Sequence, residues 1–212
     1  MKHYSKKELD ILDSRYRAHF INSVTGYKSA NLLGTKSPDG TTNLAVFSSV
    51  THLGSNPPLL GFVLRPRTVS RNTYDNLRRT GFFTVNHVNS DIIIPAHKTS
   101  AKYDSGISEF SRTGLNEEFL DGFEAPYVKE SVIKIGCSYQ NEYYIKENEC
   151  LLIVGLMQHI YVDEGVQNED GWLDLEKAKT VTVNGLDGYA LPTILDRLSY
   201  AKPGEEVNSI IK

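Results

Sequence analysis

Two long segments rich in β-branched and aromatic residues constrain the fold of this chain most strongly. Val132–Ile145 and Glu149–Val162 are separated by only a few polar residues. This composition is typical of β-strands, and so short a link allows only an antiparallel pairing of the two. We therefore expect two long antiparallel strands.

Shorter strand signals surround this pair. Ala30–Thr35 and Thr42–Val50 flank the turn sequence Ser37-Pro38-Asp39-Gly40, which predicts a β-hairpin. Leu59–Leu64 is an apolar run bounded by prolines, and Phe82–Val88 is the next strand candidate. Many short strands with hairpin-type connections favour a mainly β fold, an antiparallel barrel, over a doubly wound sheet.

Few helices are expected, and all are short. Ser5-Lys6-Lys7-Glu8 fits a capping box at the start of a helix in an N-terminal extension over residues 1–25. The segment from Ser70 to Gly81 predicts a helix that is capped at Ser70 or Asn72 and stopped by glycine. Residues 92–97 favour a helical turn, and residues 102–122 form a long polar excursion typical of a functional lid.

Length and composition place the chain among ordinary globular proteins. Its 212 residues fit a single domain over 1–212, with a C-terminal tail over 180–212 packing on the barrel or on a partner. The net charge of −3 and the pI near 6.1 provide no basic field for nucleic acid. The apolar runs are shorter than the ~20 residues of a membrane span, and the N-terminus has no apolar signal region, so we expect a cytoplasmic protein with no membrane partner.

The sequence lacks the motifs of several kinds of functional site. Cys137 and Cys150 have no Cys-x-x-Cys spacing and are expected to be reduced and buried. The histidines have no metal-ligand spacing, so no metal is predicted, and no serine has a hydrolase setting. The phosphate-binding glycine motifs of dinucleotide-binding folds and of nucleoside triphosphatases are also absent.

The stretch from Asn43 to Thr51 combines a strand pattern with a run of small hydroxyl residues. Such a surface suits an isoalloxazine ring, which needs an apolar cover on one face and hydrogen bonds at its polar edge. A surface strand leading into a Ser/Thr loop has the same pattern. The stretch alone leaves both interpretations open.

The stretch from Arg65 to Thr73 places three arginines and three hydroxyl residues just before and at a predicted helix start. Guanidinium groups, hydroxyls and the free N–H groups of a helix start together stabilise a phosphate monoester. The alternative is a solvated basic loop with an ordinary helix cap.

Taken in order, these pieces resemble the flavin reductase-like, FMN-binding split-barrel family. The resemblance covers most of the chain and is strongest from Asn43 to Asn86: the Asn-x-Ala-x-Phe-Ser strand, the Pro57-Pro58 pair, the basic-polar-Thr triplet 71–73 and the segment 80–86. Residues 96–103, with Ser108-Glu109-Phe110, are similar to the flavoredoxin-type branch, as are parts of the tail.

The resemblance implies a homodimer of antiparallel Greek-key split β-barrels with FMN bound noncovalently near the subunit interface. The residues that it implies for FMN are Asn43 in the strand motif; Phe47, Ser48, Ser49, Val50 and Thr51 along the ring; Arg65, Ser70, Arg71, Asn72 and Thr73 at the phosphate and ribityl chain; and Asn86 on the next strand.

Two departures from the family pattern bear on function. Members that reduce free flavin with NAD(P)H often carry Gly-Asp-His where this chain has Asn148-Glu149-Cys150. Many relatives have Pro-Arg-Pro where it has Gly26-Tyr27-Lys28. The expected function is a flavoprotein oxidoreductase that passes hydride or electrons from a donor such as NAD(P)H through FMN to free flavin or a redox partner protein. An FMN-binding electron carrier, a flavin-storage protein and a dimeric scaffold without flavin remain alternatives, and no catalytic residue is assigned.

Overall fold

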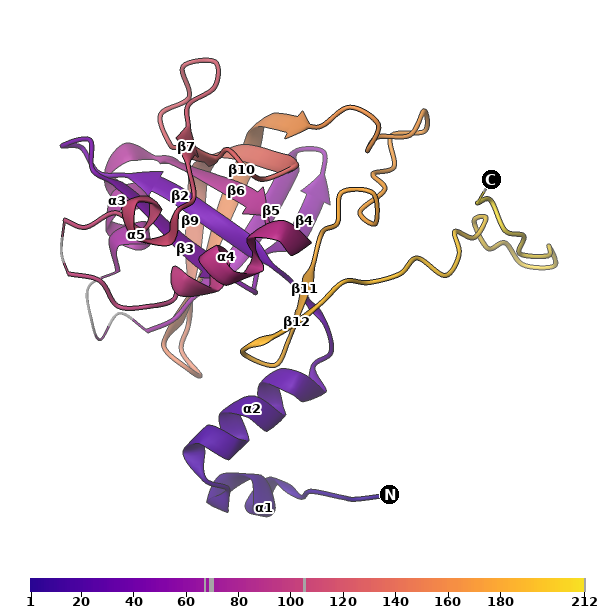
Figure 1. Ribbon diagram of the computed structural model, residues 1–212. Coiled ribbons are helices and arrows are strands. Elements are labelled where there is room, and N and C mark those ends of the chain that lie inside the picture. Colours follow the sequence, from indigo (N-terminus) through magenta and orange to yellow (C-terminus); the bar gives the residue numbers. More distant parts are fainter. Residues whose placement is uncertain (67, 69–70, 105, 212) are drawn as a thin grey trace.

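The computed structural model describes residues 1–66, 68, 71–104 and 106–211, and its main body is a seven-stranded antiparallel sheet (Figure 1). In order across the sheet the strands are β3 (Thr42–Phe47), β2 (Asn31–Lys36), β6 (Phe82–His87), β9 (Ile133–Ile145), β10 (Cys150–Val162), β5 (Pro58–Leu64) and β4 (Thr51–Ser55). The predicted mainly β, antiparallel architecture is confirmed.

The two long predicted strands form the central hairpin. β9 and β10 pair antiparallel along their length, and their outer edges pair with β6 and β5. The register shifts at Val154/Gly155 and again at Met157/His159. Such bulges increase the local twist, which helps the sheet to curl.

The curled sheet brings β3 back towards β5. The ring of Phe47 on β3 lies 5.3 Å from that of Phe62 on β5, edge to face. Just after β3, the Ser49 hydroxyl donates to the Val63 carbonyl at 3.2 Å and accepts from the Val63 N–H at 3.1 Å. We call this junction between β3 and β5 the seam. Inside the curl lies a core of buried side chains that includes Leu33, Leu60, Phe62, Phe83, Val85 and Ile153.

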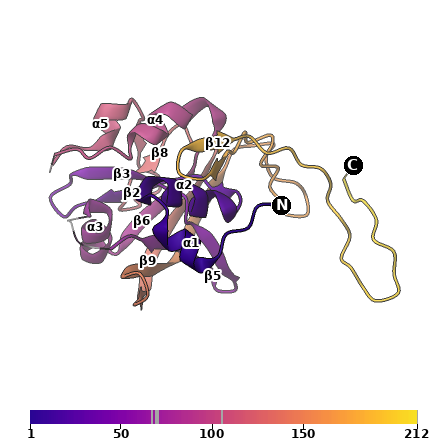
Figure 2. The same ribbon diagram turned by 90° about the horizontal axis from the view of Figure 1, so that it is seen from below.

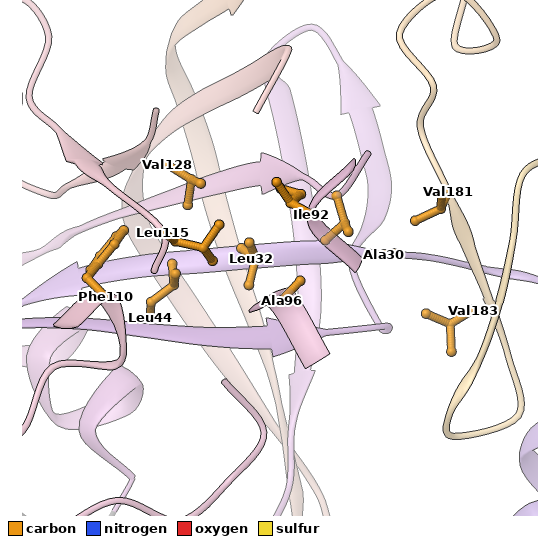
Figure 3. Packing of buried hydrophobic residues seen from close by; sticks show 11 residues of the cluster. Ala30, Leu32, Leu44, Ile92, Ala96, Phe110, Leu115, Val128, Val181 and Val183 are labelled. Carbon is orange, nitrogen blue, oxygen red and sulfur yellow. The ribbon is translucent and has the colours of Figure 1, made fainter. Parts of the chain in front are cut away.

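A second core covers the outer face of the sheet. Leu32 and Leu44 on neighbouring strands pack beneath Ala96 and Phe110, as Figure 3 shows. These come from the short helices α4 (Ile93–Lys98) and α5 (Glu109–Thr113), and α4 follows the 3₁₀ turn η1 (Ser90–Ile92). The helix predicted over residues 92–97 is confirmed. Both faces of β2 are thus buried.

The predicted hairpin is confirmed, but its second strand ends earlier than expected. β3 pairs with β2 from Thr42 to Phe47 and then stops. The side chain of Ser49 turns to Val63 across the seam, and a separate strand, β4, begins at Thr51. A single strand over Thr42–Val50 was therefore wrong. Because β3 and β4 lie at opposite edges of the sheet, residues 48–50 are a crossing between its two edges.

The predicted cap of the next helix also needs correction. α3 (Asn72–Thr80) has Arg71 as its N-cap, so Asn72 is the first helical residue, and Ser70 lies outside the described residues. The C-terminal end follows the prediction, because Gly81 adopts φ 79° and its N–H donates to the Leu77 carbonyl. α3 packs against β2, β3 and β6.

Both chain ends project from the barrel (Figures 1 and 2). Helices α1 (Lys6–Ile11) and α2 (Ser14–Val24) contain no buried residue, although the predicted capping box at Ser5 and Glu8 is present. The strand β1 (Lys28–Ser29) joins β11 (Thr182–Asn184) and β12 (Gly188–Ala190) in a small sheet. β7 (Glu117–Glu118) pairs with β8 (Tyr127–Val128). Beyond Ala190 the tail extends away from the barrel and forms no helix or further strand up to residue 211. It contacts the loop before β11 through an ion pair between Arg197 and Asp170 at 2.6 Å.

Within the described residues, no helix has the length and apolarity needed to cross a membrane. Cys137 and Cys150 are both buried and unpaired, as predicted.

Candidate functional site

The first end of the candidate site lies where α3 begins against β3. The Asn43 side-chain amide donates to the Thr73 hydroxyl at 3.1 Å, and both side chains are buried. Arg71, beside them, has its Nε atom buried with no partner among the described residues. A buried guanidinium N–H without an acceptor is costly, so a ligand that supplies oxygen atoms would stabilise this arrangement.

The second end lies at the crossing after β3. Ser49 holds the seam closed through Val63, while the Val50 carbonyl accepts from the Ser29 hydroxyl at 2.8 Å. Thr51 is exposed at the start of β4. The chain from the end of β5 to α3 connects the two ends, because Val63 lies at Ser49 and Thr73 lies at Asn43.

The structure places the other predicted residues as follows. Phe47 turns its ring into the barrel against Phe62. Ser48 is half-buried, and Arg65 and Asn72 are exposed at the two ends of the connecting segment. The prediction for Ser70 lies outside the described residues.

Asn86 is not brought to the seam. It lies on β6, which β2 separates from β3, and is fully buried. Its amide donates to the Leu32 carbonyl at 3.1 Å and to the Thr84 hydroxyl at 2.9 Å, while its carbonyl accepts from the Val128 N–H at 3.0 Å. These bonds tie β2, β6 and β8 together, so the side chain has a structural task here.

Part of the polar excursion over residues 102–122 covers β3. The Leu44 N–H donates to the Glu109 carboxylate at 2.8 Å, and the hydroxyls of Thr42 and Ser108 are 2.9 Å apart. Burial raises the pKa of Glu109. No sequence pattern predicts this contact, because it joins residues 65 positions apart.

A cavity of about 220 Å³ opens at the end of the barrel interior, and we call it the barrel mouth. Its polar side includes Asn31 and His87, and its apolar floor includes Leu60, Val85 and Ile135. Val50 and Thr51 also line it, so the barrel mouth adjoins the crossing after β3. Asn31 was missed by the sequence analysis, and His87 was considered only as a metal ligand. Among the described residues, no group of three or more His, Cys, Asp or Glu side chains could hold a metal ion.

His87 should make stability depend on pH. Burial lowers its pKa from 6.5 to about 4, so in mildly acidic solution the unfolded chain takes up a proton that the folded chain does not. The contribution of neutral His87 to the free energy of unfolding is fully present above pH 6.5. It should be lost as pH falls towards 4, which lowers the free energy of unfolding by up to about 3 kcal/mol. Urea unfolding of the wild type and of His87→Phe across this range checks it. The difference in the free energy of unfolding between the two proteins should change with pH. Equal pH dependence of the two free energies would rule the effect out.

Comparison with known proteins identifies the family and the fold. The sequence profile of the flavin reductase like domain matches residues 27–182. The chain belongs to the flavin reductase-like family. A split barrel domain protein from Shewanella frigidimarina NCIMB 400 is 45% identical, with a TM-score of 0.92 over 95% of this chain and 100% of that one. The family and the split-barrel fold are thus confirmed.

Two more distant structures share the fold. The flavoredoxin of Desulfovibrio vulgaris (Miyazaki F) has a TM-score of 0.69 at 22% identity, over 84% of this chain and 92% of that one. An FMN-binding protein from Thermus thermophilus has a TM-score of 0.64 at 16% identity, over 78% of this chain and 86% of that one. At these identities the likeness concerns the fold alone.

Proposed function

We propose that this flavin reductase-like chain binds FMN along the seam and acts as a flavoprotein oxidoreductase. The observation that carries the proposal is the buried Nε of Arg71, which has no partner in the described part of the chain and lies at the start of α3, near Thr73. The residues fit a flavin mononucleotide, because a guanidinium, a hydroxyl and a helix start suit its phosphate. The polar backbone of the crossing suits its ring.

The chain's residues divide by task. Arg71 and Thr73 would bind the phosphate, with Arg65 and Asn72 at the rim, and Asn43 orients Thr73 through their hydrogen bond. Residues 48–51 would offer backbone and hydroxyl groups to the ring edge. Bound FMN supplies two-electron redox chemistry, while the protein supplies position and shields the ring from water.

The turn at Asn148–Cys150 bears on whether NAD(P)H is the electron donor. The position of the family's Gly-Asp-His is a β-turn here, in which the Cys150 N–H donates to the Asn148 side chain at 3.2 Å and Glu149 adopts φ 59°. Leu151 pairs with Leu64, so this turn lies next to the segment that carries Arg65. With no histidine there, we expect slow oxidation of pyridine nucleotide.

Stopped-flow mixing of the FMN-loaded protein with NADH or NADPH checks this expectation through bleaching of the flavin absorbance. Slow bleaching favours an electron carrier that is served by a different donor. Rapid bleaching would contradict the expectation and favour a flavin reductase that passes electrons on to free flavin or another acceptor. Replacing Cys150 by histidine should speed bleaching if the missing side chain is the cause.

We also propose a homodimer, which the projecting ends support. Leu195, Leu198 and Tyr200 on the tail are largely exposed, as are Ile11 and Val24 on the N-terminal helices. Apolar groups on projecting segments gain stability when a second copy covers them. Light scattering of the full chain tests this, and a monomer at micromolar concentration would contradict it.

The two unpaired cysteines support a cytoplasmic location.

A further inference from the structure

The barrel mouth contains two polar atoms that have no partner among the described residues. Asn31 Nδ2 and His87 Nδ1 are both buried and accept or donate no hydrogen bond among the described residues. Asn31 is only 2% exposed. A buried polar group without a partner costs about 1–3 kcal/mol, and native structures rarely keep two such groups together.

Strand register explains why the two atoms are neighbours. Asn31 on β2 lies directly opposite His87 on β6 in an antiparallel pair. Side chains of such a pair point to the same face of the sheet. Leu33 and Val85, the next inward pair, belong to the barrel core, so Asn31 and His87 continue that inner face into the cavity.

The chemistry of the lining selects a type of ligand. Leu60, Val85 and Ile135 form an apolar floor, and none of the described residues that line the cavity is Asp, Glu, Lys or Arg. Burial lowers the pKa of His87 to about 4, so its imidazole is neutral at pH 7. The Asn31 amide is a donor, and a neutral imidazole Nδ1 can accept. The cavity is smaller than a typical ligand pocket of ~300–1,000 Å³, so it suits one small ring or one edge of a larger ring system.

We infer that the barrel mouth binds the edge of a neutral, planar cyclic amide, with its C=O accepting from Asn31 Nδ2 and its N–H donating to His87 Nδ1. Two sources offer this edge. One is a separate lactam or imide, and the other is the pyrimidine end of the flavin ring itself. The second source rests on the proposed function, and Val50 and Thr51, which line the mouth and belong to the predicted ring site, make it reachable.

The test uses the full ¹⁵N-labelled chain without flavin and 2-pyridone as the probe. Titration should shift the Asn31 side-chain amide and the His87 imidazole signals, with a millimolar dissociation constant. His87→Phe should weaken binding about tenfold, in line with the loss of one hydrogen bond in a buried site. His159→Phe is the matched control, since that histidine packs against Phe123 outside the barrel, and its binding should stay unchanged. Far-ultraviolet circular dichroism confirms that each variant is folded.

Adding FMN then separates the two sources. Displacement of 2-pyridone assigns the edge to the flavin, and retention assigns it to a separate ligand. If 2-pyridone binds but FMN does not bind at all, the proposed function fails and this inference stands. If the mouth signals do not move in the wild type, or if His87→Phe binds as well as the wild type, the mouth holds only water and the inference is overturned.

Discussion

Gly34→Ala should destabilise the protein by about 3 kcal/mol, because overpacking and the loss of a buried hydrogen bond add together. Gly34 lies on β2, and an added Cβ would collide with the Pro126 carbonyl and would lie 2.6 Å from the Thr84 hydroxyl. These two atoms are themselves hydrogen-bonded at 2.6 Å and fully enclosed. The extra methyl group therefore has to separate β2 from the segment before β8.

Thermal unfolding measures the effect. For a chain of this size a loss of about 3 kcal/mol lowers Tm by roughly 6–12 °C. Gly54→Ala is the control, because Gly54 lies on edge strand β4 and its added Cβ would meet only the Pro57 carbonyl, at 3.3 Å. That variant should melt within about 2 °C of the wild type. Equal melting temperatures for the two variants would show that β2 is not packed as described.

Most strands could be predicted from the sequence, because their formation depends on local residue patterns. The β9–β10 hairpin follows from composition, and the β2–β3 hairpin follows from its turn residues. The end of β3 at Phe47 was not predictable, because it depends on hydrogen bonds between Ser49 and Val63 on another strand. β4 was missed because an exposed edge strand needs little hydrophobic pattern.

The candidate site shows the same limit. The resemblance named residues along both ends of the seam, and the structure joins Asn43 to Thr73 across 30 positions of sequence. It could not reveal the pairing of Asn31 with His87, because strand register is set by the whole sheet. The hydrogen bonds of the Asn86 side chain to β2 and β8 also depend on this register and could not be predicted.

The second large effect concerns the phosphate end of the seam. Arg71→Ala removes the guanidinium whose buried Nε has no partner among the described residues. A hydrogen bond to a charged group contributes about 1.5–3 kcal/mol, so FMN should bind roughly 10-fold to 150-fold more weakly. Riboflavin has the same ring without the phosphate, and its affinity should change little. Arg79→Ala is the matched control, because that arginine is exposed at the far end of α3.

The most direct measurement is a fluorescence titration of the wild type and of Arg71→Ala with FMN and with riboflavin, carried out at one salt concentration because the phosphate contact is ionic. FMN binding along the seam predicts that the wild type prefers FMN and that the variant loses this preference while it still binds riboflavin. A wild type that binds neither flavin, or a variant that loses both equally, would contradict the placement of FMN at this site.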